Sequence, residues 1–561
     1  MPRRLPSGGR LIDRDRPVAF RWNGRRLSGF AGDTLASALL GAGQGLLGRS
    51  FKYHRPRGPV AAGAEEPNAL VSAGRGARRT PNLRATTLAL APGLSAESQN
   101  HWPSLEVDVG EAAAALSPLL PAGFYYKTFI HPRRASKWPF EPAIRAAAGL
   151  GRAPERPDPD DYEHFHAFAD VGVAGGGVSG LAAALAAARA GARVILAEQS
   201  GRWGGRAATD GVEIDGRPAE DWVAETVAAL EAEANVVLLP NAQVAAVHDH
   251  GYVLIAEDAA ANGAEGLRER LWRVRAGRVV VAAGAIERPV AFAGNDRPGV
   301  MLASAVRDYL DLWGVACGEE TVVVGVNDDA YRTALALHGA GLKVAAVVDP
   351  RPEPDGALPA AAREAGLRVM AGREVVAAKG RARLRGVEIA ETGRGGAGSG
   401  FPHCDCVAMS GGWSPAVHPW SHCGGGLSWD AVGLMLRPDS DRPPRGHDGA
   451  GFVICAGAAS GRLGAAEGLA DAHAAGARAA AETAATRDPG PAPVASAPAE
   501  APPAPLWTMP PQMPPKLAAK AFLDFQNDVK VADLRLAARE GYESVEHAKR
   551  YTTLGMATDQ G

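Results

Sequence analysis

Residues 168–200 read FADVGVAGGGVSGLAAALAAARAGARVILAEQS, and this stretch decides the fold. An apolar run leads into a glycine-rich turn, an alanine-rich run follows, and a second apolar run ends at Glu198. In a dinucleotide-binding βαβ unit, Gly175 would allow the tight turn, Gly177 would let the backbone approach a pyrophosphate and Gly180 would permit close helix–strand packing. The helix N-terminus then faces the phosphates, and Glu198 is placed to accept from ribose hydroxyls. The stretch therefore predicts a dinucleotide-binding domain.

Three later stretches complete this pattern and add a second Rossmann unit, which we expect to be a structural copy without a dinucleotide. Residues 321–349 repeat the strand–helix–strand order, but Asp328 and Asp329 replace the fingerprint glycines and would repel a pyrophosphate. Residues 277–289 predict a buried strand, and residues 452–482 predict a strand, a glycine turn and a long helix. The expected fold class is α/β. We expect a two-dinucleotide-binding-domain (Rossmann-like, FAD/NAD(P)-binding) core in which the last helix returns to the first cofactor.

The N-terminal residues predict a β-grasp domain of the ferredoxin type. Two short strands flank an Asn23-Gly24 turn, and Asp33-Thr34 begins an amphipathic helix. In ferredoxins, cysteines hold the iron–sulfur cluster, and the loop after such a helix supplies them. Here that loop, GRSFKYHRPRGPVAAGAEEPNALV, contains no cysteine, so we expect this domain to lack a cluster.

The segments between the motifs give the expected domain boundaries. Prolines crowd residues 489–515, which predicts an extended linker, and short amphipathic helices are expected at Val531–Arg539 and Ser544–Arg550. The expected division is a cluster-free β-grasp domain at 1–110, a connecting segment at 111–165, a first dinucleotide-binding domain at 166–300 and 400–485, a second, degenerate Rossmann domain at 301–399, a proline-rich linker at 486–515 and a small helical region at 516–561.

Composition and charge argue against several classes of protein. The 561 residues include 60 Lys+Arg and 62 Asp+Glu, so overall charge does not favour nucleic acid. The first 57 residues carry twelve cations and three acids, which we interpret as a solvated or subunit-facing surface. No apolar run reaches the length of about 18 residues that a membrane-spanning helix needs, and no secretory signal is visible. All five cysteines lie at or after Cys317, which predicts a cytoplasmic protein without disulfides.

Candidate catalytic and metal-binding residues are sparse. A loose group of histidines and cysteines lacks the paired spacing of structural zinc sites, so no metal is expected; its members are His403, Cys404, Cys406, His418, His422 and Cys423. No serine–histidine–acid or paired-carboxylate motif stands out, and the catalytic residues stay unknown. The aromatic and basic stretch at 124–140 is typical of an interface, and we expect it to contact a partner subunit.

Nine stretches, spread over nearly the whole chain, resemble a single family. They are FAGDTLASALL (30–40), GRSFKYHRPRG (48–58), AGAEEPNALV (62–71), NHWPSLEVDVG (100–110), PAGFYYKTF (121–129), NDDAYRTAL (327–335), SGGWSPAVH (410–418), DFQNDVK (524–530) and SVEHAKRYTTLGMATDQG (544–561). These strings are similar to those of the alpha subunit of heterotetrameric sarcosine oxidase. The resemblance implies an oxidoreductase subunit, active only with partner chains, in a complex that demethylates sarcosine to glycine.

The resemblance also implies cofactors and partners. In this family the sarcosine site and FAD lie in the beta subunit, and NAD is bound by the alpha subunit. A covalent FMN at the alpha–beta interface passes electrons to oxygen and gives hydrogen peroxide, and gamma and delta subunits complete the complex. The family's alpha subunit continues into a tetrahydrofolate-binding, aminomethyltransferase-like domain. This sequence stops at Gly561, where that domain would begin, so we expect a truncated chain or a separate folate-binding polypeptide. Tetrahydrofolate is expected only if that domain is supplied.

The family's NAD pocket carries over to matching positions of this chain. The pyrophosphate of NAD would contact Gly175, Gly177, Ser179 and Gly180, and its phosphates would also contact Gly204, Gly205 and Arg206. The ribose would contact Glu198, and the adenine would contact Val244. The far end of the cofactor would contact Gly457, Ala458, Leu463 and Ala465. By residue chemistry alone FAD would fit equally well; the resemblance favours NAD, and the Glu198 carboxylate disfavours the 2′-phosphate of NADP. Two alternatives stay open: the alpha subunit of an opine, proline or hydroxyproline dehydrogenase, and a scaffold that binds a nucleotide without redox turnover.

Overall fold

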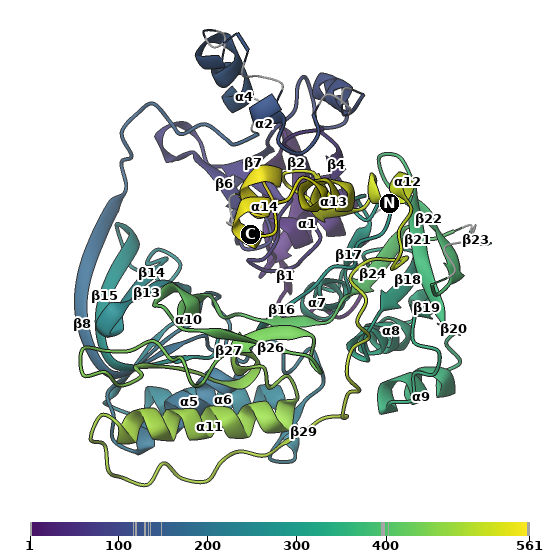
Figure 1. Cartoon of the computed structure of the whole chain (residues 1–561). Coiled ribbons are helices and arrows are strands. Elements are labelled where there is room, and N and C mark those ends of the chain that lie inside the picture. The colour runs from purple at the N-terminus through teal and green to yellow at the C-terminus, as the bar shows by residue number, and fades with distance from the viewer. Residues whose placement is uncertain are drawn as a thin grey trace. The chain divides into compact units, whose positions relative to one another are not determined.

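The computed structural model forms two compact α/β units, and it describes residues 3–115, 117, 120–127, 131, 132, 134, 136–146, 149–393, 399–401 and 403–557 (Figure 1). Unit 1 comprises Met1–Asp158, Arg288–Gly412 and Ala504–Gly561, and unit 2 comprises Pro159–Glu287 and Trp413–Pro503. The α/β class expected from the sequence is confirmed. Within the described ranges, no helix is both long and apolar enough to cross a membrane.

Unit 2 is built on a mixed sheet with strand order β12-β9-β8-β15-β14-β13, in which β28 also pairs with β15. The strands are β8 (Asp161–Ala174), β9 (Val194–Ala197), β12 (Val236–Leu239), β13 (Ala242–His248), β14 (Tyr252–Glu257), β15 (Leu267–Val281) and β28 (Val453–Cys455). Helices α5 (Val178–Arg189), α6 (Ala219–Glu231) and α11 (Ala465–Ala481) lie together on one side of it (Figure 1). Strands β8, β9, β15 and β28 run parallel at the centre, as a dinucleotide-binding sheet requires.

Small residues let two helices of unit 2 meet closely. The buried face of α5 consists largely of alanine, and a Cβ on Gly476 of α11 would lie 2.1 Å from the carbonyl oxygen of Ala183. The two helices therefore touch backbone to backbone. The smaller elements of unit 2 are β10 (Glu213–Ile214), β11 (Arg217–Pro218), β16 (Ala285–Glu287), β25 (Trp413–Pro415), α10 (His418–His422), β26 (Leu427–Asp430), β27 (Met435–Pro438) and β29 (Ala495–Ser496).

The N-terminal part of unit 1 contains the expected hairpin. Strands β1 (Asp13–Trp22) and β2 (Arg25–Ala31) pair around Asn23 and Gly24, both at positive φ, as a two-residue turn requires. The sheet order is β2-β1-β7-β5-β6. Its other strands are β5 (Leu70–Ala73), β6 (Thr80–Arg84) and β7 (Ser95–Ser98), and a separate ladder joins β3 (Gly48–Arg49) to β4 (Pro56–Arg57); the helices of this region are α2 (Phe124–Lys127) and α4 (Glu141–Ala146).

Helix α1 (Leu35–Gly41) differs from the expected amphipathic helix. Thr34 caps its N-terminus, since its hydroxyl accepts from the backbone N–H of Ser37. All seven residues of α1 are buried, so the helix has no solvated face. The prediction of an amphipathic helix was wrong because tertiary packing covers both sides of this short segment.

The second Rossmann domain lies within unit 1. Its parallel sheet has the order β17-β24-β18-β19-β20. The elements are β17 (Val300–Leu302), α7 (Ala303–Trp313), β18 (Glu320–Gly325), α8 (Asp329–Gly339), β19 (Lys343–Asp349), α9 (Ala357–Glu364), β20 (Val369–Ala371) and β24 (Cys406–Ser410), with a side sheet of β21 (Arg373–Gly380), β22 (Leu384–Glu391) and β23 (Ser399–Phe401). We expected residues 400–485 to join the first domain. Strand β24 instead pairs with β17 and β18, and the chain returns to unit 2 at Trp413.

The C-terminal elements of unit 1 match the expected helices. They are α12 (Pro515–Ala518), β30 (Phe522–Asp524), β31 (Val529–Lys530), α13 (Val531–Arg539) and α14 (Val545–Thr552), whose cap position is Ser544. Within the proline-rich linker, β29 pairs with β10 of unit 2, and the linker passes into unit 1 at Ala504.

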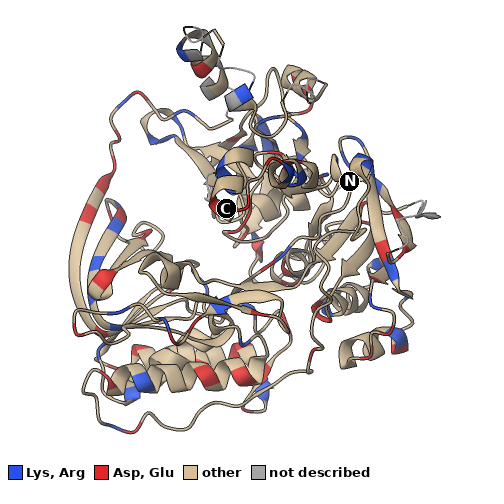
Figure 2. Cartoon of the chain, viewed as in Figure 1, with Lys and Arg blue, Asp and Glu red and all other residues tan. Residues whose placement is uncertain are grey.

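The basic N-terminal segment finds acidic partners inside unit 1. Arg3 pairs with Asp405, Arg10 with Asp311 and Arg55 with Asp296. In Figure 2 blue and red segments are interspersed over this unit. Part of the local positive charge is therefore balanced by residues far away in the sequence.

Glu66 organises a buried loop of unit 1 that has no regular secondary structure. One carboxylate oxygen accepts from the backbone N–H groups of Val60 and Ala61, both at 2.7 Å, and the other accepts from Asn68 at 2.6 Å and Ala69 at 3.1 Å. The side chain is buried. This carboxylate satisfies four backbone donors that would otherwise be buried without partners.

We predict that Glu66→Gln lowers the free energy of unfolding by about 3 kcal/mol, because an amide NH2 would face two backbone N–H donors. Chemical denaturation monitored by circular dichroism measures the change. Exposed Glu106→Gln is the control and should unfold at the same denaturant concentration as the unmodified chain. Equal midpoints for all three proteins would contradict this role of Glu66.

Candidate functional site

The glycine turn between β8 and α5 has the geometry of a phosphate-binding loop. Gly175 has φ +103°, and a Cβ there would lie 2.5 Å from the Ala282 carbonyl oxygen. A Cβ on Gly180 would lie 1.8 Å from the carbonyl oxygen of Gly175. These two glycines are required by the fold of the protein itself.

The fold itself leaves room for a side chain at Gly177. Its φ is −66°, and the nearest atom to a Cβ placed there is the Gly205 Cα at 3.9 Å. A Cβ at Gly177 would therefore be accommodated without a clash, and it would project from the N-terminus of α5. That open space, beside the N–H groups of a helix start, fits the close approach of a pyrophosphate.

The second predicted loop lies against the first. Gly204 donates its backbone N–H to the Gly176 carbonyl at 2.8 Å and bridges to Gly177, and both Gly204 and Gly205 have positive φ. Arg206 pairs with Asp210 at 3.2 Å, and its guanidinium lies 5.5 Å from the Trp413 ring centroid. The structure thus brings the predicted residues 175–177 and 204–206 into one constellation.

Glu198 has a structural task in addition to its predicted one. One carboxylate oxygen accepts from the Gly176 backbone N–H at 2.7 Å, and the other accepts from the backbone N–H and hydroxyl of Ser200 at 2.8 and 2.9 Å. A carboxylate has about four acceptor positions, so capacity for a ribose hydroxyl remains. Glu198 is buried and fixes the glycine turn from the end of β9.

The turn before α11 meets the same glycine loop. A Cβ on Gly457 would lie 2.3 Å from the Ser179 hydroxyl oxygen, so the Gly457–Ser460 turn packs against the start of α5. Gly464 caps α11, and its N–H is accepted by Glu467. The N-terminal ends of α5 and α11 therefore lie near each other, and both helix dipoles favour an anionic group there. Of the other predicted residues, Ala458 and Ala465 are half-buried and Leu463 is exposed.

Val244 lies on β13 and lines a small apolar cavity. The cavity is also lined by Gly172, Ala174 and Ile195, which belong to the strands on either side of the glycine turn. Val244 pairs with Ile255 of the neighbouring strand β14. Val244 is thus close to the strand ends that lead into the predicted nucleotide site.

Asp471 is a residue of this site that sequence reasoning missed. One oxygen accepts from the Gly457 backbone N–H at 3.0 Å and the Ser460 hydroxyl at 2.9 Å, and the other accepts from Arg462 at 2.9 Å. A single carboxylate on α11 therefore holds the turn that faces the glycine loop. The sequence signal was an acid in the second turn of a helix that follows a glycine turn.

The second Rossmann unit uses carboxylates at the corresponding position. Asp328 and Asp349 pair with Arg351 at 2.8 and 2.7 Å, and Asp329 pairs with Arg307 at 3.0 Å. These carboxylates are buried. The chain's own ion pairs lie where a phosphate would bind at the start of α8, which is consistent with the degenerate fingerprint.

The cysteines are arranged for packing. The strand β24 that carries Cys406 is wholly buried, and burial raises the pKa of Cys404 and Cys406 to about 12. Such thiols stay protonated and poorly reactive. Across the ranges that the structure describes, no group of three His, Cys, Asp or Glu residues could hold a metal ion.

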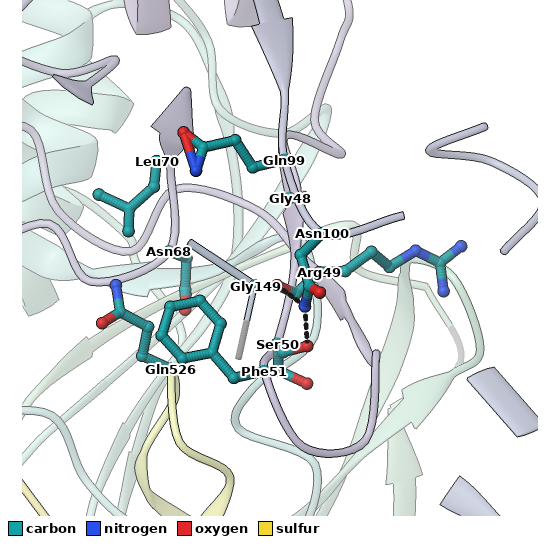
Figure 3. Close-up of a pocket in the computed structure, with 10 residues that line it drawn as sticks. All are labelled: Gly48, Arg49, Ser50, Phe51, Asn68, Leu70, Gln99, Asn100, Gly149 and Gln526. Carbon is teal, nitrogen blue, oxygen red and sulfur yellow. Dashed lines mark hydrogen bonds between the residues drawn. The ribbon is translucent and has the colours of Figure 1, made fainter. Parts of the chain in front are cut away.

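Unit 1 contains a small polar cavity of a different kind (Figure 3). Its lining includes four amide side chains and consists of Gly48, Arg49, Ser50, Phe51, Asn68, Leu70, Gln99, Asn100, Gly149 and Gln526. Asn100 donates to the Ser50 carbonyl at 2.6 Å, whereas the buried Oδ1 atom of Asn68 has no hydrogen-bond partner within the described part of the chain. The cavity is large enough for about one water molecule.

Three family models match parts of the chain. A 2Fe-2S iron–sulfur cluster binding domain matches residues 15–101, an FAD dependent oxidoreductase model matches 170–267, and a sarcosine oxidase A3 domain matches 518–561. Residues 15–101 contain no cysteine, so they lack the ligands of a cluster held by cysteines. The FAD dependent oxidoreductase match covers the glycine turn and Glu198.

Relatives and one solved structure cover the whole chain. The sarcosine oxidase subunit alpha of Rhizobium meliloti (strain 1021) is 45% identical over 569 residues, covering 100% of this chain and 55% of the relative. That of Corynebacterium sp. (strain P-1) is 35% identical, covering 100% of this chain and 54% of the relative. The crystal structure of L-proline dehydrogenase from P. horikoshii has a TM-score of 0.65 at 19% identity and covers 98% of this chain and 90% of that one. The similarity to L-proline dehydrogenase shows that the two proteins share a fold.

The glycine turn, the returning helix α11 and the FAD dependent oxidoreductase match define the class: this chain contains a flavin- or nucleotide-binding α/β domain of the kind found in FAD dependent oxidoreductases. More particularly, it is a homologue of the alpha subunit of sarcosine oxidase, which confirms the resemblance drawn from the sequence. The chain spans about half the length of the curated relatives it matches.

We predict that Gly177→Val abolishes dinucleotide binding and leaves the melting temperature unchanged, because its Cβ has room in the protein and the side chain would block the close approach expected of a pyrophosphate. Isothermal titration with dinucleotide and thermal melting measure the two effects. The control is Gly339→Val at the end of α8, where a Cβ meets nothing within 4 Å. Retained binding in Gly177→Val would show that the pyrophosphate does not approach this turn.

We also predict that Asp471→Ala weakens dinucleotide binding about tenfold, since the turn loses a charged acceptor that contributes roughly 1.5–3 kcal/mol. The same titration measures it. The matched control is Glu482→Ala, which removes an arginine-paired carboxylate from the other end of α11. An equal loss in both variants would mean that the effect comes from general destabilisation of the helix.

Proposed function

We propose that this chain is the alpha subunit of a sarcosine oxidase complex. The observation that carries the proposal is 45% identity to such a subunit along the full length of the chain. The complex would convert sarcosine to glycine with release of hydrogen peroxide. The sarcosine site and FAD would lie in a beta subunit, gamma and delta subunits would complete the assembly, and the location would be cytoplasmic. Transfer of the methylene group to tetrahydrofolate would need a further domain.

We propose NAD as the dinucleotide of unit 2. The open space at Gly177, the adjoining loop at Gly205 and the nearby start of α11 suit a pyrophosphate. The Glu198 carboxylate would accept from ribose hydroxyls and would repel the 2′-phosphate of NADP. NAD, when bound, can accept a hydride and, once reduced, donate one. The proposal that NAD occupies this site holds equally if the bound NAD takes no part in the reaction. The residues themselves bind and orient it through backbone N–H groups, helix dipoles and Glu198.

We propose that residues 516–561 face a flavin mononucleotide at the interface with the beta subunit. Their match to a sarcosine oxidase A3 domain supports this assignment. The segment is packed into unit 1: Tyr551 of α14 accepts from Lys127 at 2.6 Å, and Lys127 pairs with Glu540 at 2.7 Å. Lys127 lies in the stretch 124–140 that we expected to contact a partner, although part of that stretch lies outside the described residues.

An imino-acid or opine dehydrogenase is the second candidate. The fold similarity to L-proline dehydrogenase, over 98% of this chain, is the observation that favours it. Such a complex would oxidise a related CH–NH bond and would pass electrons to an acceptor other than oxygen. The two candidates differ in substrate and in peroxide formation.

Co-expression with candidate partner chains tests the proposal. We predict a yellow complex that forms peroxide with sarcosine and not with proline, and that releases NAD on heat denaturation. The control complex carries Gly177→Val, which should assemble and lack NAD. Proline-dependent dye reduction without peroxide would favour the second candidate, and FAD in place of NAD would overturn the nucleotide assignment.

A further inference from the structure

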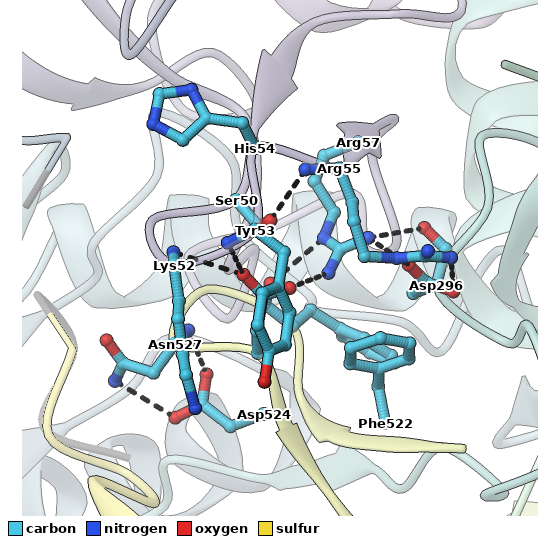
Figure 4. A network of polar contacts seen from close by, with 12 residues as sticks. Ser50, Lys52, Tyr53, His54, Arg55, Arg57, Asp296, Phe522, Asp524 and Asn527 are labelled. Carbon is cyan, nitrogen blue, oxygen red and sulfur yellow. Dashed lines mark hydrogen bonds and ion pairs between the residues drawn. The ribbon is translucent and has the colours of Figure 1, made fainter. Parts of the chain in front are cut away.

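Two lysine ammonium groups converge on one buried tyrosine in unit 1. Lys52 Nζ lies 4.9 Å from the centroid of the Tyr53 ring and 5.2 Å from that of Phe124. Lys530 Nζ lies 4.8 Å from the Tyr53 centroid and donates to its hydroxyl at 3.1 Å. In Figure 4 the Lys52 side chain runs alongside the ring of Tyr53. The two charges come from segments almost 480 positions apart, so tertiary structure alone brings them together.

Neither ammonium group has a counterion in contact. Within the described residues, Lys52 Nζ makes neither a hydrogen bond nor an ion pair, and Lys530 Nζ bonds only to the phenol of Tyr53. That phenol donates its own proton to the Leu120 carbonyl at 3.2 Å. Burial and the neighbouring Asp533 raise the pKa of Tyr53, so it remains neutral and does not serve as the missing anion.

The nearby carboxylates have other tasks. Asp528 binds the Arg57 guanidinium at 2.6 Å and accepts the backbone N–H groups of Lys52 and Tyr53. Asp533 accepts the backbone N–H of Lys530 at 2.9 Å, at the start of α13. They act on Lys52 at a distance and raise its pKa, whereas burial and Lys530 lower it, with a net decrease. Both ammonium groups thus lie beside Tyr53, and neither has a carboxylate in direct contact among the described residues.

We propose that Lys52 and Lys530 form a binding site for a phosphate-type dianion, held between loop 48–57 and β31. Two ammonium groups match the charge of a phosphate or phosphate monoester, whose oxygens are strong acceptors. The aromatic walls of Tyr53 and Phe124 hold the Lys52 side chain in place. This inference needs neither the NAD site nor the flavin assignment.

Titration of the full chain with inorganic phosphate at low ionic strength tests the site. We expect binding in the unmodified chain, at least tenfold weaker binding in Lys52→Met and in Lys530→Met, and near-normal binding in Lys52→Arg, which keeps the charge. The control is Lys516→Met on the exposed start of α12. Phosphate should also slow acetylation of Lys52, measured by mass spectrometry, because a bound dianion keeps the amine protonated.

A second titration, with flavin mononucleotide and with riboflavin, distinguishes free phosphate from the phosphate group of a larger ligand. Tighter binding of flavin mononucleotide than of phosphate, with riboflavin inactive, would identify the group as part of a larger ligand, and equal binding would identify free phosphate. Absence of phosphate binding in the unmodified chain, or an equal loss in Lys516→Met, overturns the site. Melting temperatures separate a lost site from a misfolded variant.

Discussion

Unit 1 depends on one buried guanidinium, that of Arg57. It binds the carboxylates of Asp296 and Asp528, and its Nε donates to the Phe525 carbonyl at 2.9 Å (Figure 4). Both carboxylates are buried, so removing the Arg57 charge would leave Asp528 buried without an ion-pair partner, at a cost of about 3–5 kcal/mol. This ion triad joins loop 48–57, the turn after Phe292 and the C-terminal segment, and it thereby sets the surroundings of Lys52.

In unit 2 the side chains that hold distant segments in place are carboxylates. Glu198 fixes the glycine turn through Gly176, and Asp471 fixes the opposite turn through Gly457. In both places a carboxylate replaces regular secondary structure as the partner of backbone N–H groups. Hydrogen bonds thus hold the backbone that would face a nucleotide in one conformation, and such preorganisation reduces the entropy lost on binding.

Local patterns made much of this architecture predictable. The β1–β2 hairpin, the glycine turn before α5 and helices α13 and α14 depend on neighbouring residues, so periodicity and turn chemistry were sufficient. The partners of Arg57 lie 239 and 471 positions later, and pairing at that range leaves no periodic signal. The same holds for Lys530 beside Tyr53. Asp471 was missed because a helical acid usually faces solvent, and α1 was misjudged because its burial is decided by distant segments.

The order of segments along the chain has a consequence for biosynthesis. Unit 1 needs Met1–Asp158, Arg288–Gly412 and the residues from Ala504 onward, with unit 2 encoded in between. During translation Arg57 emerges early, whereas Asp528 follows only after both parts of unit 2 have left the ribosome. Until then, Asp296 is the one carboxylate of the triad that has been synthesised to pair with Arg57. Unit 2 can close sooner, so the emerging chain would complete its nucleotide-binding half before the half that begins it.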